Sequence, residues 1–134
     1  FEQALAQADF ISLNCDLNPT SYHIINAHSL AFVKTSAILI NTARGQLVDE
    51  SALITALEEE RLGGAALDVF EVEPLPVDSP LREMENVMLA PHNSNSSPSA
   101  WERVHWSSIH NLLLGLQIDH ADLEEIQHKI TSNQ

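Results

Sequence analysis

The chain has 134 residues, which is enough for one domain and too few for two of ordinary size. Hydrophobic residues make up 44% and charged residues 19%, and these globular proportions exclude disorder as the overall description. Nineteen acidic residues against six Lys and Arg give a net charge of −13, so we expect neither nucleic acid nor an anionic membrane surface as a partner.

Short apolar segments alternate with amphipathic ones along the chain. Apolar runs predict strands over residues 10–15, 37–41, 65–70 and 87–90. Helical patterns cover residues 1–8, a segment over 27–33 capped by Asn26, and a helix that Asp49 opens and that Gly63 and Gly64 end at a left-handed C-cap. A capping box of Ser99 and Glu102 predicts a last, long helix, with an apolar stripe formed by Trp106, Ile109, Leu113 and Leu116.

This alternation predicts an α/β fold built on a doubly wound parallel sheet of about four strands with flanking helices. In such sheets ligands bind beyond the carboxyl ends of the strands. The segments at those ends contain the residues of interest: Cys15 and Asp16, Thr42 to Gly45, Asp68 to Glu73, and His92 to Asn95.

Three of these residues could form a catalytic site. Arg44 follows a buried strand, where a guanidinium can hold a carboxylate through two hydrogen bonds, although a surface salt bridge is the alternative. Glu73 and His92 follow adjacent strands, so a carboxylate could fix the imidazole tautomer in an acid/base pair. A capping histidine and a solvated glutamate remain the alternative for that pair.

The other candidate ligands have simpler explanations. The single cysteine, Cys15, excludes an internal disulfide framework and fits a reducing, cytoplasmic compartment. His105 and His110 are five residues apart, which is not the spacing of a helical metal pair, and we expect no metal site. No apolar run approaches the roughly 18 residues of a membrane helix.

Three ordered motifs resemble the D-isomer-specific 2-hydroxyacid dehydrogenase family. ILINTARGQLVDESALITAL resembles the family's strand, Arg-Gly and following helix; GGAALDVFEVEPLP resembles its Asp-containing strand and Glu-Pro; NVMLAPHNS resembles its strand ending in Pro-His. The resemblance covers roughly residues 5–115. It implies a Rossmann-like domain and an oxidoreductase that transfers a hydride between NAD or NADP and a small 2-hydroxy or 2-oxo acid.

The resemblance also implies residue roles. Arg44 is expected to hold the substrate carboxylate, His92 to act as the acid/base, and Glu73 to pair with His92. The residues expected to contact the cofactor are Cys15, Thr42, Ala43, Arg44, Asp68, His92 and Ser94.

The four glycines, at positions 45, 63, 64 and 115, cannot form a G-x-G-x-x-G phosphate loop. We therefore expect residues 1–117 to be the C-terminal part of a dinucleotide-binding domain from a longer protein, and residues 118–134 to be a polar tail. The exposed edge of such a partial sheet predicts a homo-oligomer. The isolated chain is expected to be inactive. A non-catalytic, corepressor-like module that senses dinucleotide, or an inactive truncated domain, is the alternative.

Overall fold

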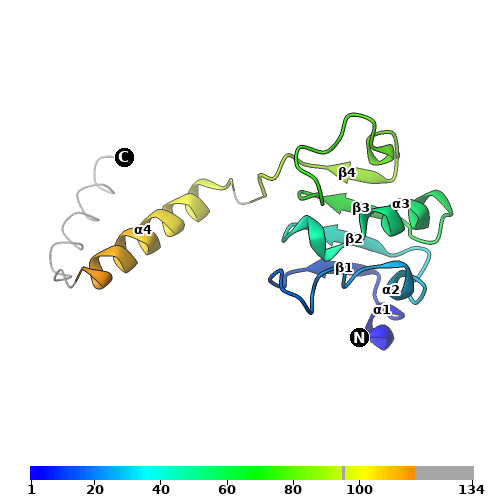
Figure 1. Cartoon of the computed structure of the whole chain (residues 1–134), viewed down its shortest axis with the longest axis horizontal. Helices are drawn as coiled ribbons and strands as arrows, with labels where there is room; N and C mark the ends of the chain where they lie inside the picture. The colour runs from blue at the N-terminus through cyan, green and yellow to red at the C-terminus, as the bar shows by residue number, and fades with distance from the viewer. Residues whose placement is uncertain (95, 117–134) are drawn as a thin grey trace. The chain divides into compact units, whose positions relative to one another are not determined.

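The computed structural model describes residues 1–94 and 96–116, and the chain divides into two compact units, Phe1–Ser94 and Asn95–Gln134. The first unit contains the sheet, and the second contains the long helix α4, Pro98–Gly115 (Figure 1). The predicted tail, 118–134, lies outside the described residues, so the predicted boundary at residue 117 stays a prediction.

The first unit is built on a four-stranded parallel sheet. Its strands are β1 (Phe10–Leu13), β2 (Ile38–Asn41), β3 (Gly64–Leu67) and β4 (Val87–Leu89), in the order β1-β2-β3-β4. Each strand pairs in parallel with the next, and Leu13, Asn41 and Leu67 lie in register. The four apolar runs of the sequence form these strands. This confirms the predicted Rossmann-like α/β architecture.

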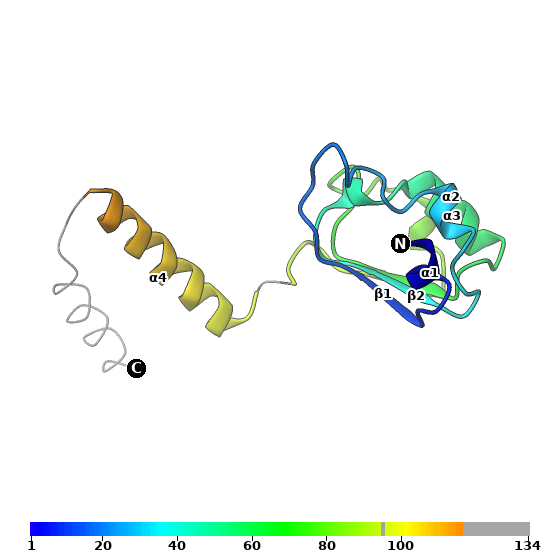
Figure 2. The same ribbon diagram turned by 90° about the horizontal axis from the view of Figure 1, so that it is seen from below.

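The three helices of this unit lie on the same face of the sheet (Figure 2). They are α1 (Glu2–Leu5), α2 (Ala27–Leu30) and α3 (Glu50–Glu58). The Asn26 side chain caps α2 by accepting from the backbone N–H groups of His28 and Ser29, and Asp49 caps α3 by accepting from Ala52. Both N-caps agree with the sequence analysis. Two single 3₁₀ turns, η1 (Gly45–Leu47) and η2 (Pro80–Arg82), lie in the connections.

The core lies between the sheet and these helices. Leu39 and Leu67 of the strands belong to one buried cluster with Leu53 and Leu57 of α3, and all four are at most 4% exposed. Burying one such leucine contributes about 2 kcal/mol relative to leaving it in water. Alternate strand residues point to the opposite face, where Phe10 and Met88 are each 71% exposed. Within residues 1–94 only one face of the sheet is therefore covered by helices.

The C-cap of α3 is formed by a different residue from the predicted Gly63 and Gly64. No described glycine has a positive φ; Glu60 adopts the left-handed conformation, with φ 55°. The N–H of Arg61 donates to the carbonyl of Ala56 at 2.8 Å, and that of Glu60 donates to Leu57 at 3.2 Å, which together form a Schellman motif. Gly63 and Gly64 serve close packing instead, since a Cβ on them would lie 2.8 Å from the Ser36 carbonyl and 2.5 Å from the Asn86 carbonyl oxygen.

The boundaries of other elements also differ from the prediction. Helix α2 ends at Leu30 rather than residue 33, because the next amide groups donate three residues back instead of four. Ser97, not Ser99, caps α4, and its side chain accepts from Ala100 N–H. No residue of α4 is buried, and its predicted apolar stripe is exposed or half-buried. No helix among residues 1–94 and 96–116 is long and apolar enough to cross a membrane.

Candidate functional site

The predicted site residues lie where the strands end. Cys15 follows β1, Thr42 to Arg44 follow β2, Asp68 and Glu73 follow β3, and His92 and Ser94 follow β4. Because all four strands are parallel, these segments share one edge of the sheet.

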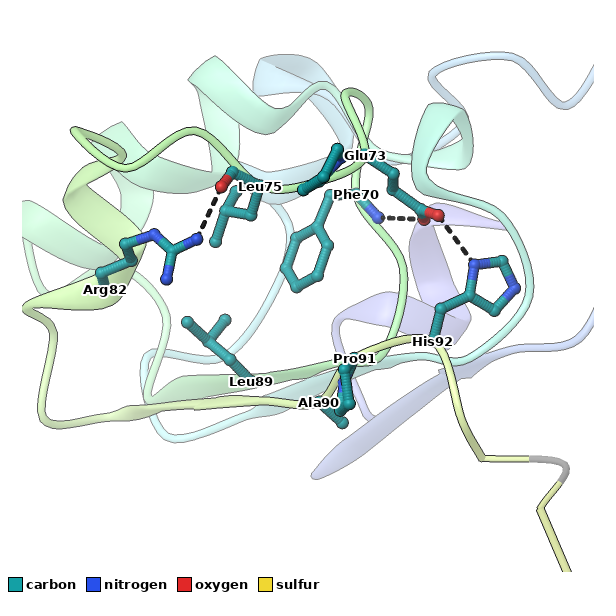
Figure 3. Close-up of a pocket in the computed structure, with 9 residues that line it drawn as sticks. Phe70, Glu73, Leu75, Arg82, Leu89, Ala90, Pro91 and His92 are labelled. Atoms are coloured by element: carbon teal, nitrogen blue, oxygen red, sulfur yellow. Dashed lines mark hydrogen bonds and ion pairs between the residues drawn. The ribbon is translucent and has the colours of Figure 1, made fainter.

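Glu73 and His92 form the best-defined contact at this edge. Nδ1 of His92 lies 2.8 Å from Oε2 of Glu73, while the other carboxylate oxygen accepts from the backbone N–H of Phe70 at 3.0 Å (Figure 3). The hydrogen bond from His92, followed by that from Phe70, lowers the pKa of Glu73 below its ordinary value. The carboxylate therefore stays ionised and engages Nδ1, which leaves Nε2 as the ring atom for proton exchange with a ligand.

The backbone of His92 is held in a strained conformation. Its φ of 55° is in the left-handed region, which is uncommon for a residue with a side chain. The buried carboxylate of Asp68 accepts from the next two N–H groups, Asn93 at 2.8 Å and Ser94 at 2.9 Å. Burial raises the pKa of Asp68, but the hydrogen bonds from Ser94 and Asn93 outweigh it, and the net shift is downward. Asp68 thereby fixes the turn that presents His92.

Arg44 lies beside this pair. Its exposed guanidinium donates from Nη1 to the carbonyl of Ala43 at 2.6 Å, and Nδ2 of Asn41 donates to the carbonyl of Arg44 at 2.9 Å. A Cβ on Gly45 would lie 1.9 Å from the carbonyl of Phe70, so only glycine allows this close approach. Arg44, Glu73 and His92 line one hollow of about 200 Å³, so the structure brings the three predicted catalytic residues together.

A larger pocket of about 600 Å³ adjoins the other side of the pair (Figure 3). Phe70, Leu75, Leu89 and Pro91 give it apolar walls, and Glu73 and His92 lie at its edge. The guanidinium of Arg82 donates to the carbonyls of Leu75 and Pro76, which shapes the loop that forms one wall.

The other predicted cofactor residues lie outside the hollow that contains Arg44. Thr42 is exposed, Ala43 is half-buried, and Cys15 is exposed with a free thiol. Ser94 takes part through its backbone contact with Asp68. Among residues 1–94 and 96–116 there is no cluster of three or more His, Cys, Asp or Glu side chains that could hold a metal ion.

Sequence reasoning assigned no role to two residues that border this site. His23 adopts φ 51°, and its Nε2 lies 2.5 Å from a carboxylate oxygen of Glu71. Glu71 lines the hollow with Arg44 and His92. The position of Glu71 between Phe70 and Glu73, just after a predicted strand, is the sequence signal that could have pointed to it. No sequence pattern links His23 with Glu71, because the two residues lie 48 positions apart.

Comparison with known proteins identifies relatives over the residues that form the sheet. Residues 1–94 match the family model described as D-isomer specific 2-hydroxyacid dehydrogenase, NAD binding domain. A glyoxylate reductase of Korarchaeum cryptofilum is 45% identical over 112 residues, which are 84% of this chain and 34% of that protein. The chain thus spans about a third of the length of this relative.

Two solved structures extend the comparison. A D-isomer specific 2-hydroxyacid dehydrogenase from Xanthobacter autotrophicus, in complex with NADPH and MES, is 46% identical with a TM-score of 0.67. The match covers 68% of this chain and 29% of the Xanthobacter chain. The NAD-complexed D-isomer specific 2-hydroxyacid dehydrogenase from Lactobacillus delbrueckii is 30% identical with a TM-score of 0.75. The match covers 89% of this chain and 40% of the Lactobacillus chain.

The described residues fit one end of a dinucleotide. Polar groups gather at the carboxyl ends of the strands, where a nicotinamide ring and a small acid could meet. The glycines at positions 45, 63 and 64 face the chain's own backbone, so none of them opens a cradle for a phosphate.

Proposed function

Because the chain belongs to the D-isomer-specific 2-hydroxyacid dehydrogenase family, we propose that the full-length enzyme containing it reduces a small 2-oxo acid to the D-2-hydroxy acid, and catalyses the reverse reaction. The observation that carries this proposal is the ion pair of His92 and Glu73 beside Arg44 in one hollow. A non-catalytic dinucleotide sensor has no need of an acid/base pair next to a carboxylate-binding arginine.

In this proposal Arg44 binds the substrate carboxylate. Its guanidinium is exposed and contacts only the neighbouring carbonyl of Ala43 among the contacts described above, so it can turn to form two parallel hydrogen bonds with a carboxylate. This anchors the acid with its carbonyl group near His92. Asn41 and Gly45 hold the backbone on either side of Arg44.

His92 is then the proton donor in reduction. Its Nε2 gives a proton to the carbonyl oxygen and takes it back in oxidation, while Glu73 retains Nδ1 and stabilises the protonated ring. A bound NADH or NADPH supplies the hydride that reaches the substrate carbon. Cys15, Thr42, Ala43, Asp68 and Ser94 are the residues that we propose line its nicotinamide end, together with Arg44 and His92.

Glyoxylate is the first substrate to test, because the relative from Korarchaeum is a glyoxylate reductase. We further propose a cytoplasmic homo-oligomer and an isolated 134-residue chain without turnover, since it lacks a G-x-G-x-x-G phosphate loop. The choice between NADH and NADPH is part of the same test.

The experiment uses the full-length gene product, whose intact mass is first compared with the 14.8 kDa of this chain. Oxidation of NADH and NADPH is followed with glyoxylate, hydroxypyruvate and other 2-oxo acids. We expect turnover, and a kcat/KM about 10- to 100-fold lower in Arg44→Gln, because a charge-assisted hydrogen bond is lost. Arg61→Gln is the matched control, since Arg61 pairs with Glu59 before β3, at the other end of the strands.

Two outcomes would contradict the enzyme assignment. Dinucleotide binding without turnover of any 2-oxo acid favours the sensing module. Neither binding nor turnover favours an inactive truncated domain.

A further inference from the structure

Glu71 connects three segments that approach the proposed active site. Its carboxylate accepts from the backbone N–H of Glu50, at the start of α3, at 3.1 Å, and its own N–H donates to the Glu50 carboxylate at 3.2 Å. Its carbonyl accepts from Nε2 of Gln46 at 3.1 Å. Glu71 thus binds both ends of the segment that begins just after Arg44.

His23 completes this network from the loop after β1. Its ring stacks on Tyr22 with centroids 4.0 Å apart and contacts the Glu71 carboxylate through Nε2. Its backbone N–H donates to the carbonyl of Gln46 at 2.9 Å. His23 therefore contacts both Gln46 and Glu71, which are also hydrogen-bonded to each other. The His23 and Glu71 side chains are each 26% exposed, and this partial burial strengthens the contact relative to a surface pair.

The network also brings two carboxylates together. Burial raises the pKa of Glu50, and the nearby charge of Glu71 adds to the rise, against the hydrogen bond from Glu71 N–H. The Glu50 and Glu71 carboxylates repel each other, and the ring of His23 contacts the Glu71 carboxylate through Nε2.

The segments that Glu71 joins carry the proposed catalytic groups. Arg44 precedes Gly45, whose Cα lies against the carbonyl of Phe70, and the N–H of Phe70 donates to Glu73. A shift of Glu71 would therefore move the Arg44 turn and the Glu73 carboxylate relative to each other. Misplacement of reacting groups by about 1 Å can reduce a rate about 100-fold.

We propose that Glu71, held by His23, is a positioning residue that sets the placement of Arg44 relative to the Glu73–His92 pair. The inference deepens the proposed function and rests on it for its effect on turnover. Glu71 lines the hollow beside Arg44, but its carboxylate is engaged by His23 and by the N–H of Glu50. In this proposal Glu71 and His23 therefore act through the loops that they join.

The activity test uses the full-length gene product with glyoxylate. We expect Glu71→Ala to lower kcat/KM about 10- to 100-fold, through an increase in KM as well as a decrease in kcat, because both Arg44 and Glu73 shift. Glu71→Gln keeps an acceptor for the Glu50 N–H and should recover most of the loss. His23→Ala should act in the same direction, and the double variant should lose less than the two single losses combined. Glu59→Ala, an exposed carboxylate paired with Arg61, is the control.

A second measurement is independent of turnover. In the 134-residue chain, ¹⁵N NMR of the His92 ring reports which nitrogen carries the proton. Glu73→Gln provides the spectrum expected when Nδ1 loses its carboxylate partner. We expect Glu71→Ala to move the His92 signals toward that reference, and Glu59→Ala to leave them unchanged.

The two measurements separate the possible failures. If no 2-oxo acid is reduced but the His92 signals move in Glu71→Ala, the proposed function fails and the positioning role stands. If the enzyme is active and Glu71→Ala changes neither the kinetics nor the signals, the inference is overturned. If Glu71→Ala does not fold, His23→Ala decides, and wild-type values for His23→Ala in both measurements overturn the inference.

Discussion

At the scale of single residues, the site depends on how His92 is held. Its left-handed backbone conformation is unfavourable for a residue other than glycine, and the surrounding groups compensate for that strain. Asp68 binds the two following N–H groups, and Glu73 binds the ring. The imidazole is therefore placed before any ligand arrives, as acid/base catalysis requires.

Replacement of Asp68 tests this support. Asp68→Asn keeps one acceptor oxygen but turns an NH₂ group toward a backbone N–H, so one buried hydrogen bond is lost. We expect a decrease of about 1–3 kcal/mol in the free energy of unfolding, measured with urea. Asp78→Asn, at an exposed loop position, should change it by less than about 0.5 kcal/mol. Equal effects of the two variants would contradict the supporting role of Asp68.

The lowered pKa of Glu73 predicts a pH dependence of stability. A carboxyl group with a lowered pKa in the folded state adds stability above its unfolded pKa of about 4.5. That stability is lost as the pH falls through the folded pKa. The difference in unfolding free energy between wild type and Glu73→Gln should therefore narrow from about pH 6 to about pH 3. A difference that stays constant over this range would show that the ionised Glu73 does not stabilise the fold.

At the scale of elements, strand and helix order could be predicted because the apolar runs and N-caps are local signals. ILIN forms β2, and Asp49 caps α3, as expected. The residue that ends α3 could not be predicted. Gly63 and Gly64 lie close after Glu60, and glycine is the residue that usually adopts the left-handed conformation at a helix C-cap. Packing decides otherwise: Gly63 and Gly64 are required where the Ser36 and Asn86 backbones approach. The contact of His23 with Glu71 is long-range and has no sequence pattern.

The left-handed Glu60 predicts a stabilising substitution. Glu60→Gly removes a strain of about 1–2 kcal/mol, offset in part by the greater freedom of glycine in the unfolded chain. We expect a net increase of up to about 1 kcal/mol in unfolding free energy, measured with urea. Glu58→Gly, in the last turn of α3, should instead destabilise the chain by up to about 1 kcal/mol. A loss of stability in Glu60→Gly would contradict the Schellman cap.

At the scale of the whole molecule, the described strands form a sheet with open edges and with one face that no helix of residues 1–94 covers. Helices α1 to α3 cover a single face, and β1 pairs only with β2 among the described residues. The other face of the sheet presents Phe10 and Met88 to solvent. Exposed strand edges and apolar faces are surfaces that associate.

We therefore expect the 134-residue chain to self-associate. Sedimentation velocity should show a weight-average mass that rises with concentration, and Phe10→Lys with Met88→Lys should reduce that rise. Val77→Lys changes an apolar residue that is 92% exposed in a loop, and it should have little effect. A strictly monomeric wild-type profile would contradict association through this face.

We propose His92 as the acid/base of a 2-oxo acid reductase. The most direct measurement is the kcat for glyoxylate reduction by the full-length gene product carrying His92→Gln, compared with wild type and with His28→Gln, a mostly exposed histidine paired with Glu2. We predict a kcat about 100- to 10,000-fold lower for His92→Gln and an unchanged kcat for His28→Gln. An active enzyme whose kcat is the same with and without His92 would contradict the account.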